Sequence, residues 1–497
     1  MADKRPVQIM TSIAYVNGAP HVGHALEYVQ ADIYARYYRM RGHDVYFLTG
    51  TDEHGSKIYK AAKDNSMGPQ DFADMNSQKF RIFSEHLNMS FDDFIRTTDQ
   101  KRHWPAVIKI WNLLQAAGLL EKRMYEGIYC MGCEAFKTEK DLINGICPDH
   151  PTTPIQKIAE ENYFFLLSKF TSEIRTLLQE KVIHLLPEHR ANEILAMMKD
   201  GLLDVSFSRA KEVLPWGVPV PNDDSQVMYV WCDALTNYIS ACGFAEESDT
   251  YKKYWANSDS RRIHFVGKDI LRFHATIWPG MLLAAKIPLP TDIRVHGYIS
   301  SNGQRMSKST GNVVDPEEYI SEFGADALRY YLAREIPASE DGDFTRARFI
   351  ELYNGELANN LGNLVQRVVA MAIKNEIMVD MNVPVLANVA EFDRALDQHL
   401  EKFEIHQAVN MMMKHFKSFN QWIDEKKPWE LAKTDKTAVA QVLSQMLNTI
   451  RAMIPYVEIF LPDTAKKIRL KLGLNPDGSG EIKPQVTEGL FMTKKDN

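Results

Sequence analysis

The sequence predicts an α/β protein in which a parallel sheet is interrupted by an insertion and followed by an all-helical bundle. Three observations support this class. A strand–helix–strand pattern opens the chain, a cysteine-bearing segment separates it from further strands, and every periodic segment from Thr345 onward is helical. The chain has 497 residues, which exceeds one ordinary core, so about three domains are expected.

The first strand–helix–strand unit lies near the N-terminus. "VQIMTSIAY" (Val7–Tyr15) is apolar enough for a buried strand, "ALEYVQADIYARYYRMRG" has helical periodicity up to Gly42, and "DVYFLTG" is a second strand. Such a unit implies a parallel sheet, whose ligands bind beyond the carboxyl ends of its strands. The polar residues at these ends are His21, His24, Asp52 and His54.

The remaining segments follow from changes of pattern. The predicted domains are 1–120, the first half of the sheet domain; 121–224, the insertion; 225–344, the second half; and 345–497, the helical bundle. The Pro-rich "EVLPWGVPVPNDDSQ" is a linker back to the sheet. "VMYVWCDA", "RIHFVGKD" and "IRVHGYIS" are predicted to be strands of the second half.

Composition excludes several classes of protein. Five cysteines are too few for a disulfide scaffold, and a net charge of -7 argues against a general nucleic-acid coat protein. No apolar run reaches membrane-spanning length, and "MADKRPVQIMTSIAYVNG" lacks the apolar stretch and cleavage site of a signal peptide. A cytoplasmic protein without a membrane partner is therefore expected.

Three cysteines and a histidine of the insertion have the spacing of metal ligands. They form the pattern C-x2-C-x13-C-x2-H through Cys130, Cys133, Cys147 and His150. Two short chelating pairs suit a closed tetrahedral zinc site, and four protein ligands leave no position open, so one structural zinc is predicted. The alternative is three free thiols and a surface histidine.

The stretch "GAPHVGH" places two histidines at the start of the first helix. Backbone N–H groups at a helix start attract anions, and His21 and His24 could donate hydrogen bonds to phosphate. Gly23 has no side chain, so a flat ring could approach the backbone there. This arrangement suits a nucleoside triphosphate, whereas the alternative is a histidine N-cap beside a solvated histidine.

A second loop, "SNGQRMSKSTGN" (Ser301–Asn312), is polar, basic and bounded by glycines. Lys308 is a mobile charge with three donors, suited to phosphate oxygens whose charge grows during a reaction, and Ser307 and Ser309 add hydroxyl groups. The alternative is a solvated hairpin loop.

Together, "HVGH" and "RMSKS" resemble the two signatures of class I aminoacyl-tRNA synthetases. "AYVNGAPHVGH", "GTDEHG", "YVWCDALTNYISA", "HFVGKDILRFHATIWP" and "GYISSNGQRMSKSTGN" narrow the resemblance to the methionyl-tRNA synthetases. The resemblance covers nearly the whole chain and implies a Rossmann-type catalytic domain, a zinc-knuckle connective insertion of the single-knuckle type, and an all-α anticodon-binding bundle.

The resemblance also implies a reaction. An AMP- and pyrophosphate-forming ligase of this kind activates L-methionine with ATP, accompanied by Mg²⁺, and transfers it to the 3′-terminal adenosine of tRNA(Met), including the initiator tRNA. The implied catalytic residues are His21, His24, Arg305 and Lys308, and the implied ATP-binding residues are His21, Gly23, His24, Gly267, Lys268, Asp269, Ser307 and Lys308. This sequence departs from the family's pattern at Arg305, where lysine is usual, and conservatively at Val22.

The resemblance also implies which residues of this sequence form the amino-acid pocket, position by position. Asp52 would pair with the substrate ammonium, and aromatic rings suit a thioether because the contact is polarisable. The implied methionine-binding residues are Ile13, Tyr15, Asp52, Trp231, Ala234, Leu235, Tyr238, His274 and Trp278. For each aromatic residue taken singly, an ordinary core position is the alternative.

Three residues of the bundle match the family's anticodon-reading positions. Asn363 and Arg367 are four apart and therefore share a helix face, and Trp429 follows a proline at a predicted helix start. Arg and Asn can hydrogen-bond unpaired bases, and Trp can stack on them. The alternative is an ordinary bundle helix with a core tryptophan.

Two other proteins could carry some of these features. A cysteinyl-tRNA synthetase would use zinc to bind its substrate, so its ligands would lie in the catalytic pocket, whereas these ligands cluster in the insertion. A zinc-stabilised RNA-binding protein would lack catalysis. Since no dimerising oligonucleotide-binding segment follows the bundle, a monomer is expected.

Overall fold

The computed structural model describes residues 4–130, 135–137, 139, 142–148, 151, 153–306, 311–386, 388–491 and 493. The chain forms two compact units, each assembled from segments that are distant in the sequence. The first consists of Met1–Pro20, Gly42–Phe83 and Phe91–Val295; the second consists of His21–Arg41, Ser84–Ser90 and His296–Asn497. Among the described residues, no helix has both the length and the apolar character needed to cross a membrane.

A seven-stranded sheet is the centre of the first unit, and its order is β2-β3-β1-β13-β14-β8, with β4 on β3. Its strands are β1 (Pro6–Thr11), β2 (Ala14–Tyr15), β3 (Asp44–Asp52), β4 (Asp93–Arg96), β8 (His184–Leu186), β13 (Arg261–Gly267) and β14 (Asp292–His296). The pairings of β1 with β3 and β13, of β3 with β2 and β4, and of β8 with β14 are parallel, which confirms the predicted parallel sheet. β8 lies inside the segment predicted as the insertion, so this segment supplies an edge strand to the sheet.

The first unit contains helices α2 to α10, of which α4 to α10 bury apolar residues in one large core. Their bounds are α2 (Ser56–Asp64), α3 (Pro69–His86), α4 (His103–Ala116), α5 (Thr171–Gln179), α6 (Glu188–Met197), α7 (Val230–Leu235), α8 (Asn237–Ser240), α9 (Asp249–Tyr251) and α10 (Trp278–Ala285), with π-helical turns at Lys252–Ala256 and Phe273–Ile277 and 3-10 turns at Leu167–Phe170 and Met198–Asp200. Trp111, Trp255 and Trp278 are fully buried in this core.

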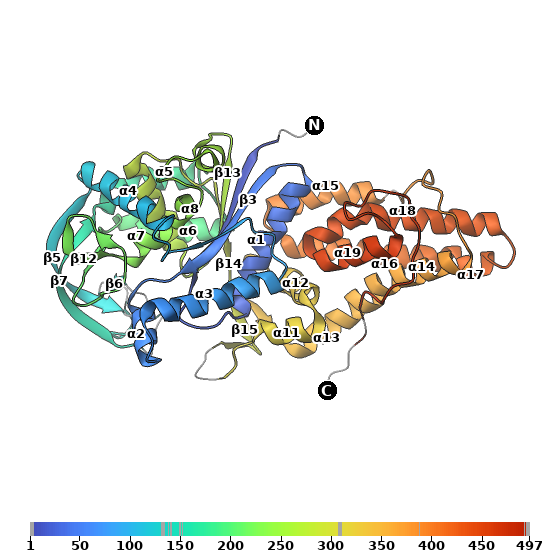
Figure 1. Cartoon of the computed structure of the whole chain (residues 1–497), viewed down its shortest axis with the longest axis horizontal. Coiled ribbons are helices and arrows are strands. Elements are labelled where there is room, and N and C mark those ends of the chain that lie inside the picture. Colours follow the sequence, from blue (N-terminus) through green and yellow to red (C-terminus); the bar gives the residue numbers. More distant parts are fainter. Residues whose placement is uncertain are drawn as a thin grey trace. The chain divides into compact units, whose positions relative to one another are not determined.

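The insertion forms two small sheets. β5 (Leu120–Cys130) and β7 (Ile155–Phe165) pair antiparallel along their whole length, with β6 (Ala135–Lys137) and β9 (Val205–Ser206) at the edges. β10 (Ser208–Ala210), β12 (Asp223–Met228) and β11 (Pro219–Val220) form the second sheet. Figure 1 shows β5 and β7 at its left-hand edge, with β6 and β12 beside them.

Three predicted strands differ from the structure. Val7–Tyr15 is divided into β1 and β2, and "IRVHGYIS" is divided between β14 and β15 (Ile299–Ser301), which belong to different sheets. "VMYVWCDA" was predicted as one strand, but β12 ends at Met228 and the helix α7 begins at Val230. A short apolar run fits a buried strand or a buried helix equally well, and the helix is the form that packs here.

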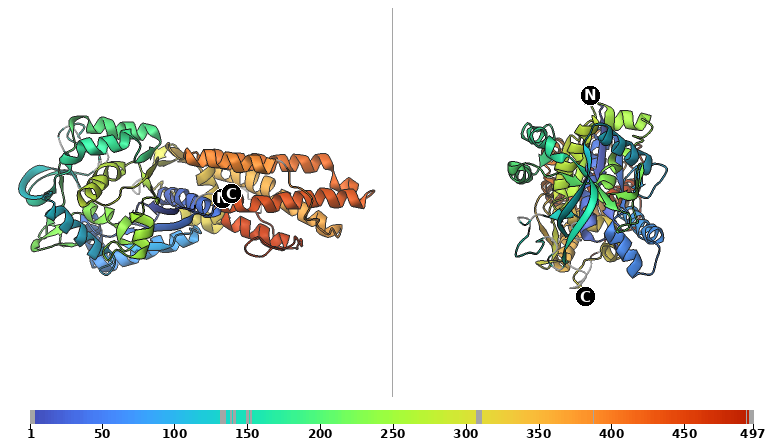
Figure 2. Two further views of the ribbon diagram at one scale, coloured as in Figure 1. Left: turned by 90° about the horizontal axis from the view of Figure 1, so that it is seen from above. Right: turned by 90° about the vertical axis from the view of Figure 1, so that its left-hand side faces the viewer.

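The second unit is mainly helical, as predicted for the C-terminal part of the chain. Its helices are α1 (Val22–Met40), α11 (Pro316–Phe323), α12 (Ala325–Arg334), α13 (Arg346–Leu352), a π-helical stretch at Tyr353–Gly362, α14 (Asn363–Lys374), α15 (Asn388–Glu401), α16 (Ile405–Lys426), α17 (Pro428–Leu431), α18 (Lys436–Phe460) and α19 (Pro462–Leu472). α14, α16 and α18 lie along one another (Figures 1 and 2). A sheet of β16 (Gln304–Arg305), β15 and β17 (Gly342–Phe344) precedes them.

A buried ion pair fastens α1 within the second unit. Asp32 of α1 contacts Arg329 of α12 at 2.7 Å, and both side chains are fully buried. Asp32 also accepts from Arg36 Nε at 2.7 Å and from the backbone N–H and hydroxyl of Ser90, each at 2.6 Å. The carboxylate therefore has charged or polar donors on both oxygens, which is the condition under which a buried charge is tolerated.

Candidate active site

Both histidines of "HVGH" cap the start of α1. The ring Nδ1 of His21 accepts a hydrogen bond from the N–H of Gly23 at 3.1 Å, and the ring Nδ1 of His24 accepts from the N–H of His21 at 3.2 Å. The two rings lie 3.9 Å apart between centroids. A Cβ on Gly23 would lie 2.9 Å from Cε1 of His21, so a side chain at this position would displace the His21 ring.

This capping determines which ring nitrogen carries the proton. A nitrogen that accepts a backbone hydrogen bond cannot itself be protonated, so the proton of each neutral imidazole is on Nε2. His21 and His24 then present Nε2–H donors beside the positive end of α1, where anions are favoured. The alternative of a histidine N-cap is correct for His21, and His24 is a second capping residue that is partly exposed.

The basic loop begins at a tight hairpin between β15 and β16. Asn302 and Gly303 both have positive φ, 53° and 72°, as the two central residues of a type I′ turn require. Asp343 accepts from the N–H of Gly303 at 2.8 Å. Arg305 at the end of the hairpin is exposed, with its guanidinium 5.9 Å from the ring centroid of Tyr298. Ser307, Lys308 and Ser309 lie outside the described residues.

The segments on both sides of this loop reach α1. The N–H of Val22 donates to the carbonyl of Val314 at 3.4 Å, and the carboxylate of Glu27 lies 3.0 Å from Nε2 of His296. Val314 follows the loop and His296 precedes the hairpin. Within the second unit, the helix that begins at "HVGH" therefore contacts the residues before and after the "RMSKS" segment, although "HVGH" and "RMSKS" are far apart in the sequence.

Gly267, Lys268 and Asp269 lie where β13 ends. Gly267 is the last residue of the strand and is buried, while Asp269 is exposed. The N–H of Ile270 donates to the carbonyl of Gly267 at 3.2 Å, which turns the chain directly after the strand. These three residues therefore occupy the carboxyl edge of the parallel sheet, the edge at which such sheets bind ligands.

Asp52 and Tyr15 meet at the same edge of the sheet. They are register partners of β2 and β3, and the N–H of Val16 donates to the carbonyl of Asp52 at 3.2 Å. Asp52 is 7% exposed, whereas Tyr15 and Ile13 are only partly buried. The predicted ammonium-binding carboxylate is thus a largely buried group at a strand end.

Four of the predicted ring residues form one cluster on α7, α8, the π-helical turn Phe273–Ile277 and the start of α10, namely Trp231, Tyr238, His274 and Trp278. Trp231 is stacked on Phe273 with centroids 3.8 Å apart and planes inclined by 12°. The Tyr238 ring lies 5.8 Å from Trp278 and 5.7 Å from His274. Ala234 and Leu235 are buried on the same short helix as Trp231. Because residues three and four apart share a helix face, Trp231, Ala234 and Leu235 form one surface.

A buried hydrogen bond orients Tyr238 and His274. Nδ1 of His274 lies 3.0 Å from the carbonyl of Ile270 and Nε2 lies 2.6 Å from the Tyr238 hydroxyl. Burial lowers the pKa of His274 to about 4, so the imidazole is neutral. Its single proton then goes to the carbonyl, and the Tyr238 hydroxyl donates to Nε2.

Two residues of this cluster were missed from the sequence. Phe273 stacks on Trp231, and His264 of β13 has its ring centroid 4.2 Å from that of Tyr238. Burial, followed by the neighbouring His274, holds the pKa of His264 well below its ordinary value, so it is neutral. The motif "HFVGKDILRFHATIWP" contains both residues, but nothing in its local pattern separates them from other core positions.

The structure describes two of the four predicted zinc ligands. Cys130 ends β5 and is fully buried, and Cys147 is fully buried as well. Cys133 and His150 lie outside the described residues. Near Cys147 the apolar side chains are more exposed than the cysteine, which is unusual. Ile143 and Ile146 are 65% and 45% exposed, whereas Cys147 is fully buried. Their backbones pair across a turn at Asn144 and Gly145, and Cys147 directly follows this turn.

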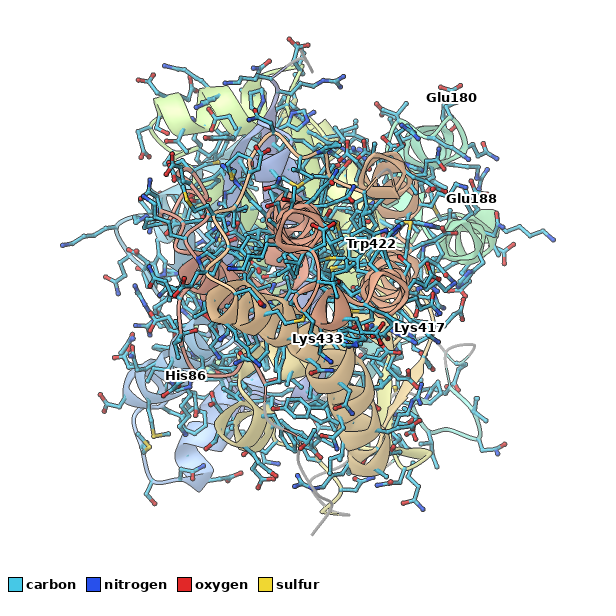
Figure 3. All side chains as sticks on the ribbon, turned by 90° about the vertical axis from the view of Figure 1, so that its right-hand side faces the viewer. His86, Glu180, Glu188, Lys417, Trp422 and Lys433 are labelled. Carbon is cyan, nitrogen blue, oxygen red and sulfur yellow. The ribbon has the colours of Figure 1, made fainter. Side chains whose placement is uncertain are left out.

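The predicted anticodon residues come together on the bundle. The Arg367 guanidinium lies 5.9 Å from the Trp429 ring centroid, and Asn363 is exposed one turn before Arg367 on α14. Arg367 donates to Asp424 at 2.8 Å and to Asn420 at 3.3 Å. Trp429 is 40% exposed. Figure 3 shows Lys417 and Trp422 of α16 and Lys433 after α17 on the same unit.

Comparisons with known families match almost the entire chain. Residues 7–153 and 150–369 match the family described as "tRNA synthetases class I (M)", and residues 377–487 match the "Anticodon binding domain of methionyl tRNA ligase". The first match includes "HVGH", the basic loop and Arg367, and the second includes Trp429.

Individual relatives are similar over the same length. Proteins named methionine–tRNA ligase from Rickettsia felis and Brucella suis are each 40% identical to this chain, over 95% and 93% of it and over 93% and 90% of their own lengths. The structure of Mycobacterium tuberculosis methionyl-tRNA synthetase in complex with methionyl-adenylate aligns with a TM-score of 0.90 and 35% identity, covering 98% of this chain and 99% of that one. The apo form of the same synthetase aligns with a TM-score of 0.84 and 31% identity, covering 100% and 99%.

Proposed function

Because this chain belongs to the methionyl-tRNA synthetase family of class I aminoacyl-tRNA ligases, we propose that Asp52 and the aromatic cluster of its first unit bind L-methionine. Members of this family activate methionine with ATP and pass it to tRNA. The observation that carries the proposal is the polarisable cluster of Trp231, Tyr238 and His274. Its neutral rings suit a thioether, and the buried Asp52 suits an ammonium.

The second unit supplies the groups that we assign to phosphate. A methionine carboxylate oxygen attacks the α-phosphorus of ATP, and the bond to pyrophosphate breaks. This step requires alignment and stabilisation of charge on phosphate oxygens but no covalent enzyme intermediate. His21 and His24 donate from Nε2, and Lys308 and Arg305 add positive charge. Mg²⁺ that accompanies ATP would supply further positive charge.

Other groups are assigned to adenosine and to the second step. Gly267, Lys268 and Asp269 at the end of β13 are proposed to hold the nucleoside. The 2′-hydroxyl oxygen of the terminal tRNA adenosine then attacks the carbonyl carbon of methionyl-adenylate, the bond to AMP breaks, and the hydroxyl proton is released. No protein side chain needs to form a bond to the substrate in either step.

Methionine-dependent ATP–pyrophosphate exchange tests this proposal. The purified protein should exchange labelled pyrophosphate into ATP with methionine and not with cysteine. Exchange with cysteine would indicate a cysteinyl-tRNA synthetase, and no exchange with any amino acid would indicate an RNA-binding protein without catalysis.

A single structural zinc is proposed for the insertion. The two described ligands fit a thiolate site, because Cys130 and Cys147 are both fully covered while apolar neighbours of Cys147 are exposed. Zinc would be held by Cys130, Cys133, Cys147 and His150 and would cross-link the insertion without taking part in the reaction.

Cys147→Ser should remove the metal and loosen the insertion while the seven-stranded sheet survives. Metal analysis should find one zinc per chain in the wild type and well under half of that in the variant, with thermal unfolding at a lower temperature. Cys242→Ser is the matched control, because Cys242 is also a buried cysteine but lies outside the ligand pattern. Wild-type protein with little zinc would contradict the site.

The surface formed by Asn363, Arg367 and Trp429 is proposed to read the anticodon. The Trp429 ring can stack on an unpaired base, and the neighbouring guanidinium can hydrogen-bond a base edge. The observed contacts with Asp424 and Asn420 hold Arg367 in place before RNA arrives.

Trp429→Ala should leave methionine-dependent exchange near the wild-type rate and weaken aminoacylation of full-length tRNA. The expected loss is about 1–3 kcal/mol, the usual value of a base–aromatic stack. It should mostly vanish with an acceptor fragment that lacks the anticodon, on which both proteins should be equally poor. Trp422→Ala is the control, because its ring contacts Lys426, not Arg367. If Trp429→Ala lowered exchange and aminoacylation alike, Trp429 would be a structural residue.

A monomer acting in the cytoplasm is also proposed. One chain carries both segments that the family comparisons match, so a single copy has the parts needed for activation and for tRNA selection. Its substrate tRNA and the ribosome that uses the product share the cytoplasm. Light scattering of the purified protein at micromolar concentration should give the mass of one chain.

A further inference from the structure

His54 is a buried residue of "GTDEHG" to which the roles above assign no function. It follows Asp52 by two residues at the end of β3, and its backbone N–H donates to Oδ1 of Asp52 over 3.5 Å. Its side chain is 2% exposed. The His54 backbone thus touches the carboxylate that is proposed to bind the ammonium of methionine.

His54 shares a buried carboxylate with a second histidine. Nδ1 of His54 lies 2.6 Å from one oxygen of Asp233, and Nε2 of His103 lies 2.7 Å from the other. Burial tends to raise the pKa of Asp233, but His54 and His103 together hold it below its ordinary value, so the carboxyl group is ionised. An ionised carboxylate only accepts hydrogen bonds, so His54 donates from Nδ1 and His103 from Nε2.

This arrangement leaves Nε2 of His54 as a hydrogen-bond acceptor that needs a donor. A neutral imidazole that donates from Nδ1 has a lone pair on Nε2. Nε2 of His54 is buried and has no hydrogen-bond partner among the residues that the structure describes. The rings beside it cannot supply a donor, because the indole N–H of Trp216 donates to the carbonyl of Glu53 and that of Trp104 donates to the carbonyl of Thr97.

The position of Asp233 connects this histidine to the methionine pocket. Asp233 belongs to α7, the short helix that also carries Trp231, Ala234 and Leu235. The His54–Asp233 hydrogen bond therefore joins the Asp52 loop to the helix proposed to contact the thioether. A buried acceptor at this junction is unfavourable unless a bound group donates to it.

Methionine has only one group that can donate, its α-ammonium. We propose that Nε2 of His54 accepts a hydrogen bond from this ammonium, next to Asp52, and that His54 is a specificity-determining residue for α-amino acids. This inference rests on the proposed methionine site. Asp52 supplies the opposite charge, and His54 supplies a directional acceptor that a carboxylic acid without an amino group cannot use.

The test compares three ligands by calorimetry: L-methionine, methioninol, which keeps only the ammonium, and 4-(methylthio)butanoate, which keeps only the carboxylate. In His54→Asn, the amide replaces the Nδ1 donor to Asp233 and removes the acceptor at Nε2. Methionine and methioninol should bind about tenfold more weakly or worse, as expected for a lost hydrogen bond to a charged group. The affinity for 4-(methylthio)butanoate should stay within about twofold of wild type.

Two control variants separate the possible failures. His103→Gln keeps a donor at Asp233 without touching Nε2 of His54, so all three affinities should stay near wild type. Asp52→Asn should weaken both ammonium ligands. If Asp52→Asn does not weaken binding of methionine and methioninol, the proposed methionine site is wrong. If Asp52→Asn weakens their binding and His54→Asn does not, only the proposed role of His54 is wrong.

Other outcomes also decide the inference. If His54→Asn weakened the binding of all three ligands equally, His54 would have a structural role. If it weakened the binding of methionine and 4-(methylthio)butanoate but not of methioninol, His54 would be a donor to the carboxylate. Either result overturns the proposal. Should His54→Asn fail to fold, His54→Gln places its amide near the Nε2 position. It must keep the wild-type preference for methionine over 4-(methylthio)butanoate within about threefold, or the proposal fails.

Discussion

Lys308→Ala should lower the rate of methionine-dependent ATP–pyrophosphate exchange by about 10²–10³-fold, which corresponds to the loss of one preorganised charge that stabilises the transition state. The ammonium of Lys308 is assigned to phosphate oxygens whose charge increases as the bond to pyrophosphate breaks. A flexible point charge with three donors can follow these oxygens during the reaction.

The methionine affinity and the exchange rate at saturating methionine together distinguish the proposed role of Lys308 from a general loss of folding or binding. Methionine affinity should be unchanged, because the residues assigned to methionine belong to other segments, and the loss should appear in the rate at saturating methionine. Lys433→Ala, which removes an exposed lysine of the bundle, should exchange at the wild-type rate. Near-normal exchange by Lys308→Ala would remove Lys308 from the mechanism.

Asp32→Asn should lower the free energy of unfolding of the second unit by about 3–5 kcal/mol, the usual cost of leaving a buried charge without its partner. The substitution keeps the shape of the side chain and an acceptor for Ser90 but removes the charge that faces Arg329 and Arg36. Urea unfolding followed by fluorescence measures the effect. Glu322→Gln, which breaks an exposed pair with Arg346, should cost less than about 1 kcal/mol.

A second substitution shows whether the unpaired charge is the cause. Adding Arg329→Met to Asp32→Asn removes the stranded guanidinium and should recover part of the lost stability. If the double variant is no more stable than Asp32→Asn, the loss comes from packing and not from charge.

The same carboxylate predicts an acid dependence. Burial tends to raise the pKa of Asp32, but Arg329, Arg36 and Ser90 lower it from 3.8 to about 2. A carboxyl group whose pKa is lower in the folded protein stabilises the fold above the unfolded pKa, and this contribution is lost as the pH falls from about 4 to about 2. Asp32→Asn should remove this component of the acid transition.

The parts of the site that were predictable from sequence are those set by neighbours in the chain. The helix start capped by His21 and the tight hairpin at Asn302–Gly303 match structures that the sequence analysis had left open as alternatives, although it expected the second histidine, His24, to be solvated. In both cases the interacting groups are within three residues, so the local sequence contains all the chemistry. The parallel sheet and the helical bundle were also predictable, because the spacing of apolar residues shows which face of a strand or helix is buried.

Only the tertiary structure decided how distant groups are paired. The sequence placed residues 230–233 in a strand, whereas they open the helix α7, and it placed β8 within an insertion, although β8 pairs with β14. His54 and Asp233 are 179 positions apart, and Asp32 and Arg329 are also remote. Each of these side chains looks like an ordinary polar residue in its own segment, because a hydrogen bond between distant segments leaves no periodic signal in either. Burial makes such pairs strong, and burial exists only once the chain has folded.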